Sequence, residues 1–134
     1  MPTKKNYPQA KGRRNKDGYF HLPHQIANQK NIAEMSAYAK ALLLDLGAQY
    51  KGYNNGDLSI VWQFMEKRGW RSKTTLYKAR DELLQNNLIV FTQHGDKKRP
   101  TLYGFTWRTI DKVSEDISVT EKIKKGDVIG GWKN

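Results

Sequence analysis

The chain of 134 residues contains no cysteine. This absence excludes disulfide frameworks, zinc sites built from thiolates and cysteine nucleophiles, and it is compatible with a reducing cytoplasm. Long apolar runs are missing as well, because the longest, Ala41–Leu44, falls far short of the ~20 residues that a membrane-spanning helix needs. The N-terminus is basic but has no apolar segment of the kind found in secretory signals. We therefore expect a soluble, intracellular protein that makes no contact with a membrane.

Acidic residues are scarce. Thirteen Asp and Glu stand against 24 Lys and Arg, which gives a formal net charge of +11. Residues 1–16 carry six basic residues and no acid, and residues 58–107 carry nine basic against four acidic residues. By contrast, residues 35–57 are balanced and residues 108–134 carry six basic against five acidic residues. The concentration of positive charge in two regions predicts a polyanionic partner, and nucleic acid is the first choice.

Constellations of residues that carry chemistry are also missing. The histidines have no carboxylate or cysteine at ligand spacing, so we predict no metal site and no cofactor. The acidic residues form no convincing catalytic pair, and Asp81 and Glu82 are expected to balance Lys78 and Arg80 on their own helix. There is no phosphate-cradling glycine loop and no nucleophile–base arrangement, so we expect no enzyme. The residues weighed here are His21, His24, His94, Asp45, Asp57, Asp81 and Glu82.

Composition and patterning predict one folded domain with a segment on either side. Hydrophobic residues make up 37% of the chain, enough for a single core. Residues 1–18 are polar and show no apolar period, which indicates a flexible basic arm. Residues 19–107 form the expected domain, and residues 108–134 are interpreted as a loosely structured extension. Its candidate anchors, to the domain or to a second subunit, are Val128, Ile129 and Trp132.

Apolar spacing predicts three main helices in the domain. The first begins at the N-cap Ser36 and runs to about Tyr50. The second is capped by Ser59, after a short strand at Asp57–Leu58, and a weaker signal predicts a short helix within Gln25–Glu34. The second helix is expected to bury Ile60 or Val61, Phe64 and Met65, and to turn Glu66, Lys67 and Arg68 outward.

The third helix has the clearest boundaries. Gly69 suits a left-handed residue that closes the second helix, and Trp70 would fold back as the apolar contact that follows it. Ser72 caps the third helix, and Asn86 or Asn87 ends it in the left-handed conformation. The predicted inward positions are Leu76, Ala79, Leu83 and Leu84, and the first two turns leave Lys73, Thr74, Tyr77 and Lys78 facing outward.

A β-hairpin is predicted after the third helix, with strands 88–93 and 101–107. The loop between them, residues 94–100, carries three consecutive cations at its tip. Both strands contain continuous apolar runs, so both faces are expected to be covered. We expect helices on one face, and the extended segment Tyr19–Leu22 or part of the C-terminal region on the other. Aromatic residues expected in the core or at its edge are Trp62, Trp70, Trp107 and Tyr103.

This order of elements across residues 36–107 resembles the winged-helix fold, an α+β class with a three-helix core and a hairpin "wing". The segment Ser72–Ala79, together with Asn87–Ile89, resembles the recognition helix and first strand of gluconate-repressor-type (GntR) regulators. Asn87 and Arg80 depart from the glycine and leucine that this family usually has there. The chain as a whole is similar to small helix-turn-helix proteins of prophages and other mobile elements.

The resemblance implies that the third helix enters the major groove of double-stranded DNA. The hairpin tip would follow phosphates or enter a minor groove, and the basic arm would lie along a minor groove. Solvated charged surfaces, and a tip that prevents strand pairing, are the alternatives without DNA. The candidate DNA-binding residues are Arg68, Arg71, Ser72, Lys73, Thr74, Thr75, Tyr77, Lys78, His94, Gly95, Lys97, Lys98, Arg99, Arg13 and Arg14.

The expected function is sequence-specific regulation of transcription in a mobile genetic element, by a protein of the bacterial cytoplasm associated with the nucleoid. A homodimer is expected because one winged helix contacts few base pairs. Three alternatives stay open. The chain would be a replication initiator or origin-binding factor of a plasmid, phage or satellite, a basic module that inhibits or assembles an acidic protein, or an RNA-binding protein. The first two functions imply contacts with the transcription or the replication machinery.

Overall fold

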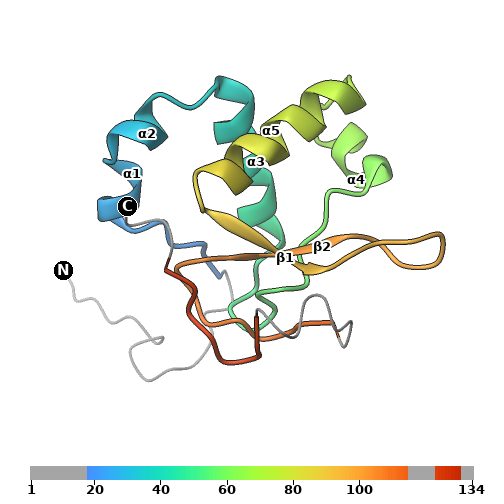
Figure 1. Cartoon of the computed structure of the whole chain (residues 1–134). Coiled ribbons are helices and arrows are strands. Elements are labelled where there is room, and N and C mark those ends of the chain that lie inside the picture. The colour runs from blue at the N-terminus through green and yellow to red at the C-terminus, as the bar shows by residue number, and fades with distance from the viewer. Residues whose placement is uncertain (1–17, 115–122, 131–134) are drawn as a thin grey trace.

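The structure, a computed structural model, describes residues 18–114 and 123–130 and has an α+β architecture (Figure 1). Within those residues, five helices precede a two-stranded antiparallel hairpin that packs against the last helix. None of these helices is long and apolar enough to cross a membrane. The elements are α1 (His24–Ala27), α2 (Lys30–Ala33), α3 (Ala37–Gln49), α4 (Trp62–Lys67), α5 (Lys73–Gln85), β1 (Ile89–Gln93) and β2 (Leu102–Phe105).

The two long helices, α3 and α5, begin at the predicted serine caps. The Ser36 hydroxyl accepts a hydrogen bond from the Ala39 N–H at 3.1 Å, and the Ser72 hydroxyl accepts one from the Thr75 N–H at 3.2 Å. Each bond satisfies one of the amides that a helix start leaves without a partner. The left-handed end of α5 is also confirmed, at Asn87 (φ 59°). The two helices share one core, to which they contribute the fully buried Leu42, Leu46, Leu76 and Leu83.

The segment before α3 differs from its prediction, because two single-turn helices replace one short helix. The Pro23 carbonyl accepts the first hydrogen bonds of α1, from the Ile26 and Ala27 N–H groups at 3.0 Å. Gln29 then adopts an extended conformation, with ψ at 145°, and this breaks the helix before α2 starts. Each turn buries one isoleucine, Ile26 or Ile32, so the core holds each turn separately.

Helix α4 begins later than predicted, and the capping role of Ser59 is wrong. The Gln49 side chain donates to the Ser59 carbonyl at 2.7 Å and accepts from the Ser59 N–H at 2.9 Å, which holds Ser59 in an extended segment. The buried position expected for Phe64 is wrong as well, since this side chain is 61% exposed. Met65 fills the inward position of α4, and Phe64, the residue before it, lies about 100° around the helix and points outward.

The hairpin pairs Ile89 with Phe105 and Phe91 with Tyr103, and both strands are shorter than predicted. At the position of the predicted short strand, Leu58 forms a single β-bridge with Tyr103. All residues of β2 are buried, so both faces of this strand are covered as expected. Of the aromatic residues assigned to the core or its edge, Trp70 and Tyr103 are buried, and Trp62 and Trp107 are half-buried.

The helices lie on one side of the hairpin and the segment after β2 lies on the other (Figure 1). The buried Asn55 holds that segment, because its amide donates to the Phe105 and Thr109 carbonyls at 3.0 Å and accepts from the Phe105 N–H at 2.7 Å. The Ser114 N–H donates to the Thr92 carbonyl at 2.8 Å. The expectation that part of the C-terminal region covers this face is confirmed. The other candidate for this role, the extended segment Tyr19–Leu22, contacts the hairpin through Phe20, whose ring packs against Phe105.

The expected C-terminal extension forms no helix or strand in residues 108–114 and 123–130, yet it is tied to the domain. The Asp111 N–H donates to the Asn55 carbonyl at 2.8 Å, and the Gly130 N–H donates to the Thr106 carbonyl at 2.9 Å. Ile110 and Ile123 are buried, whereas Val128 is 57% exposed, so Val128 is not an anchor to the domain. Of the other two candidate anchors, Ile129 is half-buried and Trp132 lies outside the described residues.

Candidate nucleic-acid interface

The turn between α4 and α5 sets the direction in which α5 leaves the core. Gly69 has φ at 102°, a left-handed conformation that side chains disfavour, and Trp70 follows as the buried contact, both as predicted. The Trp70 N–H donates to the Met65 carbonyl at 3.1 Å, and its indole N–H donates to the Asp45 carboxylate of α3 at 2.7 Å. The start of α5 is thus fixed to two neighbouring helices.

The first two turns of α5 present polar side chains to solvent. The predicted inward residues Leu76, Ala79 and Leu83 are fully buried, and Leu84 is half-buried. Thr75, at the edge of the surface, is half-buried as well. The exposed residues are Arg71, Ser72, Lys73, Thr74, Tyr77 and Lys78, which we call the α5 face. The division of this helix into an inward and an outward side therefore matches the prediction.

The α5 face is positively charged. No residue in the described part of the chain forms an ion pair with Arg71, Lys73 or Lys78. The Lys73 ammonium lies 5.9 Å from the centroid of the Trp62 ring, a cation–π geometry that leaves its charge unneutralised. The N-terminal end of a helix adds further positive potential. Asp81 reduces the charge only further along, where it pairs with Arg80 at 3.0 Å.

Two charged residues, Arg68 and Glu82, make contacts that differ from those predicted from the sequence. Arg68, predicted to face phosphate, forms a two-nitrogen contact with Asp45, at 2.8 and 2.9 Å. Its guanidinium thereby holds the α4–α5 turn against α3. Glu82, expected to balance Lys78 or Arg80, accepts instead from the N–H of Ser36 at 2.9 Å and from its hydroxyl. That expectation is wrong for Glu82 because its side chain points towards the start of α3.

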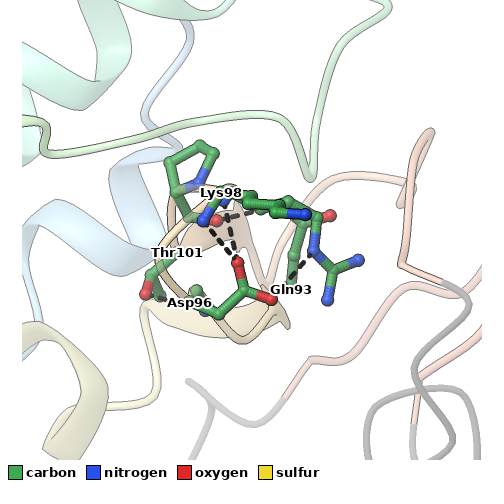
Figure 2. A network of polar contacts seen from close by, with 7 residues as sticks. Gln93, Asp96, Lys98 and Thr101 are labelled. Carbon is green, nitrogen blue, oxygen red and sulfur yellow. Dashed lines mark hydrogen bonds and ion pairs between the residues drawn. The ribbon is translucent and has the colours of Figure 1, made fainter.

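The hairpin loop, residues 94–101, is closed by its own polar contacts (Figure 2). The Asp96 carboxylate accepts from the N–H groups of Lys98 at 2.8 Å and Arg99 at 3.0 Å, and these bonds hold the pKa of that carboxyl below its usual value. The Thr101 hydroxyl accepts from the Gly95 N–H at 3.1 Å. Because a Cβ atom at Gly95 would lie 2.6 Å from the Thr101 nitrogen, only glycine fits there.

The cationic side chains of the hairpin loop differ in whether they form ion pairs. Arg99 lies 3.6 Å from Asp96, whereas Lys97 and Lys98 form no ion pair with any residue that the structure describes. All of residues 94–100 are exposed, His94 included, although its ring also packs against Phe91. The ordered turn therefore presents two unpaired lysines to solvent.

The hairpin contacts α5 through aromatic side chains. Tyr103 of β2 is fully buried and interacts with Arg80 of α5, and burial raises the pKa of its hydroxyl. The Arg80 guanidinium in turn lies 5.0 Å from the centroid of the Tyr77 ring. In Figure 1 the hairpin loop extends beyond the helices on the side where α4 and the start of α5 lie. The start of α5 and the hairpin loop thus lie towards the same end of the molecule.

Sequence reasoning missed the residues that support this surface. Asp45 holds the α4–α5 turn. Asn55 holds the segment after β2. One signal was present, because Asp45 is an acidic residue inside the otherwise apolar stretch 41–48, and such a residue is rarely buried without a partner. Nothing in the sequence indicates that its partners are Arg68 and Trp70.

Some predicted features fall elsewhere. Arg13 and Arg14, with the rest of the basic arm up to residue 17, lie outside the described residues. Across residues 18–114 and 123–130, no three His, Asp or Glu side chains gather as metal ligands do. Comparison of the chain with protein-family models, with curated proteins and with solved structures found no match.

Proposed function

We propose that the protein binds double-stranded DNA as a winged helix, with α5 as the recognition helix and the hairpin loop as the wing. The observation that carries this proposal is the α5 face. There Arg71, Lys73 and Lys78 form no ion pair in the described structure and stand among hydroxyl-bearing residues. A helix fits the B-DNA major groove, and unneutralised cations are what phosphates attract.

Individual roles follow from position. Lys73, Thr74 and Tyr77 are assigned to base edges, since the first turns of a recognition helix enter the groove. Lys78 and Arg71 are assigned to phosphates. Ser72, the N-cap of α5, and Thr75 are also assigned to phosphates, through their hydroxyl groups. In the loop, Lys97 and Lys98 contact the backbone or the minor groove, with Arg99 beside them, and His94 and Gly95 lie where the loop leaves the strands. Arg68 acts indirectly, by fixing the turn.

Salt dependence tests DNA binding itself. With about five to eight phosphates neutralised, the logarithm of the association constant should fall with the logarithm of salt concentration at a slope of about −5 to −7. Fluorescence anisotropy of a labelled duplex, titrated at several salt concentrations, measures this slope. Failure to bind any duplex at ~50 mM salt would overturn the proposal, because even non-specific binding is measurable under such conditions.

Matched variants test the surface. Lys97→Ala with Lys98→Ala should weaken binding to all duplexes alike and flatten the salt slope by about 2. The control is Lys124→Ala with Lys125→Ala, which removes the same charge from two exposed lysines of the segment after β2. Lys73→Ala and Thr74→Ala should instead reduce discrimination between sequences, by about 1–3 kcal/mol for a good bidentate contact. Equal losses in the loop and control pairs would refute the assignment of the wing.

The biological role that we propose is regulation of transcription in a mobile element, which rests on the resemblance to small helix-turn-helix proteins. Genome-wide footprinting tests it. Sites at promoters, with changed expression when the protein is removed, would support regulation. Repeated sites within a replication origin would favour the replication initiator instead.

A further inference from the structure

Helix α3 exposes apolar side chains on the side that faces away from the core. Tyr38 and Leu44 are 61% and 64% exposed, and the exposed Ala41 lies between them. Phe64 of α4, at 61%, continues this apolar surface. A helix that is apolar on both sides normally lies between two layers of protein. In the described structure α3 has only one such layer.

The apolar side chains line a groove between α3 and the α4–α5 turn. The main hollow, of about 690 Å³, has Tyr38, Ala41 and Leu44 on one wall and Lys67 and Arg71 on the other. A second hollow adjoins it, lined by Ala48 and Phe64 and again by Lys67. Since Tyr38 and Ala48 are separated by about 15 Å along the helix axis, the groove has room for about three turns of a partner helix.

The charge in the groove is positive. Asp45 lies in both hollows, but its carboxylate is already bound by Arg68 and by the Trp70 indole. Lys67 and Arg71 form no ion pair with any residue in the described ranges. A second copy of the chain, with its net charge of +11, would be repelled. An apolar floor beside unpaired cations is complementary to apolar and carboxylate groups together.

We propose that this groove binds an acidic amphipathic helix of a partner protein. Its apolar side chains pack on Tyr38, Leu44 and Phe64, and its carboxylates face Lys67 and Arg71. This is the helix-in-groove mode of recognition, in which anchors recur at i, i+3, i+4 and i+7. The groove shares Arg71 with the α5 face, so the tests below use Leu44 and Lys67, which are not part of that face.

The test uses the full chain and a synthetic probe, a capped helical peptide of about 15 residues with leucine at the anchor spacing and glutamate between the anchors. In an isotope-labelled sample, its addition should shift the amide signals of Tyr38, Ala41 and Leu44 saturably, with a dissociation constant below about 1 mM. A peptide with lysine in place of glutamate should not bind. Absence of saturable shifts with the acidic peptide would overturn the proposal.

Two variants locate the site. Leu44→Glu should lower the affinity for the acidic peptide by at least about tenfold, because it places a charge at the centre of the apolar side of the groove. Lys67→Glu should weaken it by about threefold or more, with a loss that shrinks as salt rises. The matched control is Val128→Glu, which puts the same residue at a similarly exposed apolar position after β2 and should leave peptide binding unchanged. Equal binding by wild type and Leu44→Glu would overturn the proposal.

The other occupants of the groove give distinct results. If a second copy covers it, sedimentation will show concentration-dependent association that Leu44→Glu abolishes. If DNA covers the groove, addition of duplex rather than peptide will shift the amide signals of α3. Leu44→Glu will then weaken binding of the duplex. Either result would replace the acidic partner. Thermal unfolding of each variant shows that the substitution has left the fold intact.

Discussion

Helices α3 and α5 are built alike but present different surfaces. Both contain 13 residues, both begin at a serine whose hydroxyl accepts from the third amide along, and they pack on each other. On their outward sides the two diverge. Helix α5 exposes Lys73, Thr74 and Lys78, whereas α3 exposes Tyr38, Ala41 and Leu44. The inward sides account for the fold, so the outward sides are where different partners are to be sought.

The comparison also separates residues that support a surface from residues that form it. Asp45 of α3 holds Arg68 and Trp70 at the turn before α5, and Glu82 of α5 caps the start of α3. Each helix thus fixes one end of the other through a carboxylate. Breaking these contacts should cost stability, whereas changing exposed residues should affect binding alone.

The largest loss of stability is expected in the shared core. Leu42→Ala and Leu76→Ala each remove a fully buried side chain, one from each helix, and should lower the free energy of unfolding by about 2–5 kcal/mol. Urea denaturation followed by circular dichroism measures this. The control is Leu44→Ala, on the outward side of α3, which should stay within about 0.5 kcal/mol of wild type. Similar losses for Leu42 and Leu44 would contradict the division into two sides.

The next largest effect is expected at Asp45. Asp45→Ala leaves the indole N–H of the buried Trp70 without an acceptor, which should lower the free energy of unfolding by about 1–3 kcal/mol. Asp57→Ala serves as the control, since it removes only an exposed pair with Lys112 and should cost at most about 1 kcal/mol. The same urea titration compares the two. An Asp45 variant no less stable than the Asp57 variant would show that this contact does not hold the turn.

The two serine caps should differ. Ser72→Ala removes a single capping bond at an exposed site and should cost about 0.5–1 kcal/mol. Ser36→Ala also removes a hydroxyl that Glu82 uses, so its cost should be higher, about 1–2 kcal/mol. A double variant with Glu82→Gln isolates the contribution of Glu82, because the extra cost of losing Ser36 should then shrink. Identical costs for both serines would mean that Glu82 adds nothing.

Local patterns predicted the parts of the fold that local chemistry determines. The turn at Gly69 and the capping bonds of Ser36 and Ser72 form within a few residues of those positions, and the sequence places all three correctly. Ser59 fails because a competing contact comes from Gln49, ten residues away. The burial of Phe64 was predicted wrongly because Phe64 and Met65 are neighbours on α4, and which of the two faces the core depends on how the helix packs.

Part of the candidate surface was predicted from the sequence, and part was not. The outward positions of α5 follow from a period of 3.6 residues, so Lys73, Thr74 and Lys78 were found from the sequence alone. Arg68 is different, because its pairing with Asp45 joins residues of two helices and has no local signature. The groove beside α3 was not foreseen either. Both of its walls are visible in the sequence, but their distance depends on how the helices pack.

The smallest effect on stability is expected on the outward sides of α3 and α5. Substitutions there should affect one binding activity each, DNA binding for α5 and peptide binding for α3. Lys78→Ala and Leu44→Glu change exposed residues and should each leave the free energy of unfolding within about 0.5 kcal/mol of wild type. Lys78→Ala should reduce the magnitude of the salt slope for DNA by about 1 and leave the acidic peptide unaffected. Leu44→Glu should weaken binding of the acidic peptide and leave the salt slope for DNA unchanged. Anisotropy with both probes on both variants tests this crossing, and a variant that weakens both would mean that α3 and α5 serve one continuous surface.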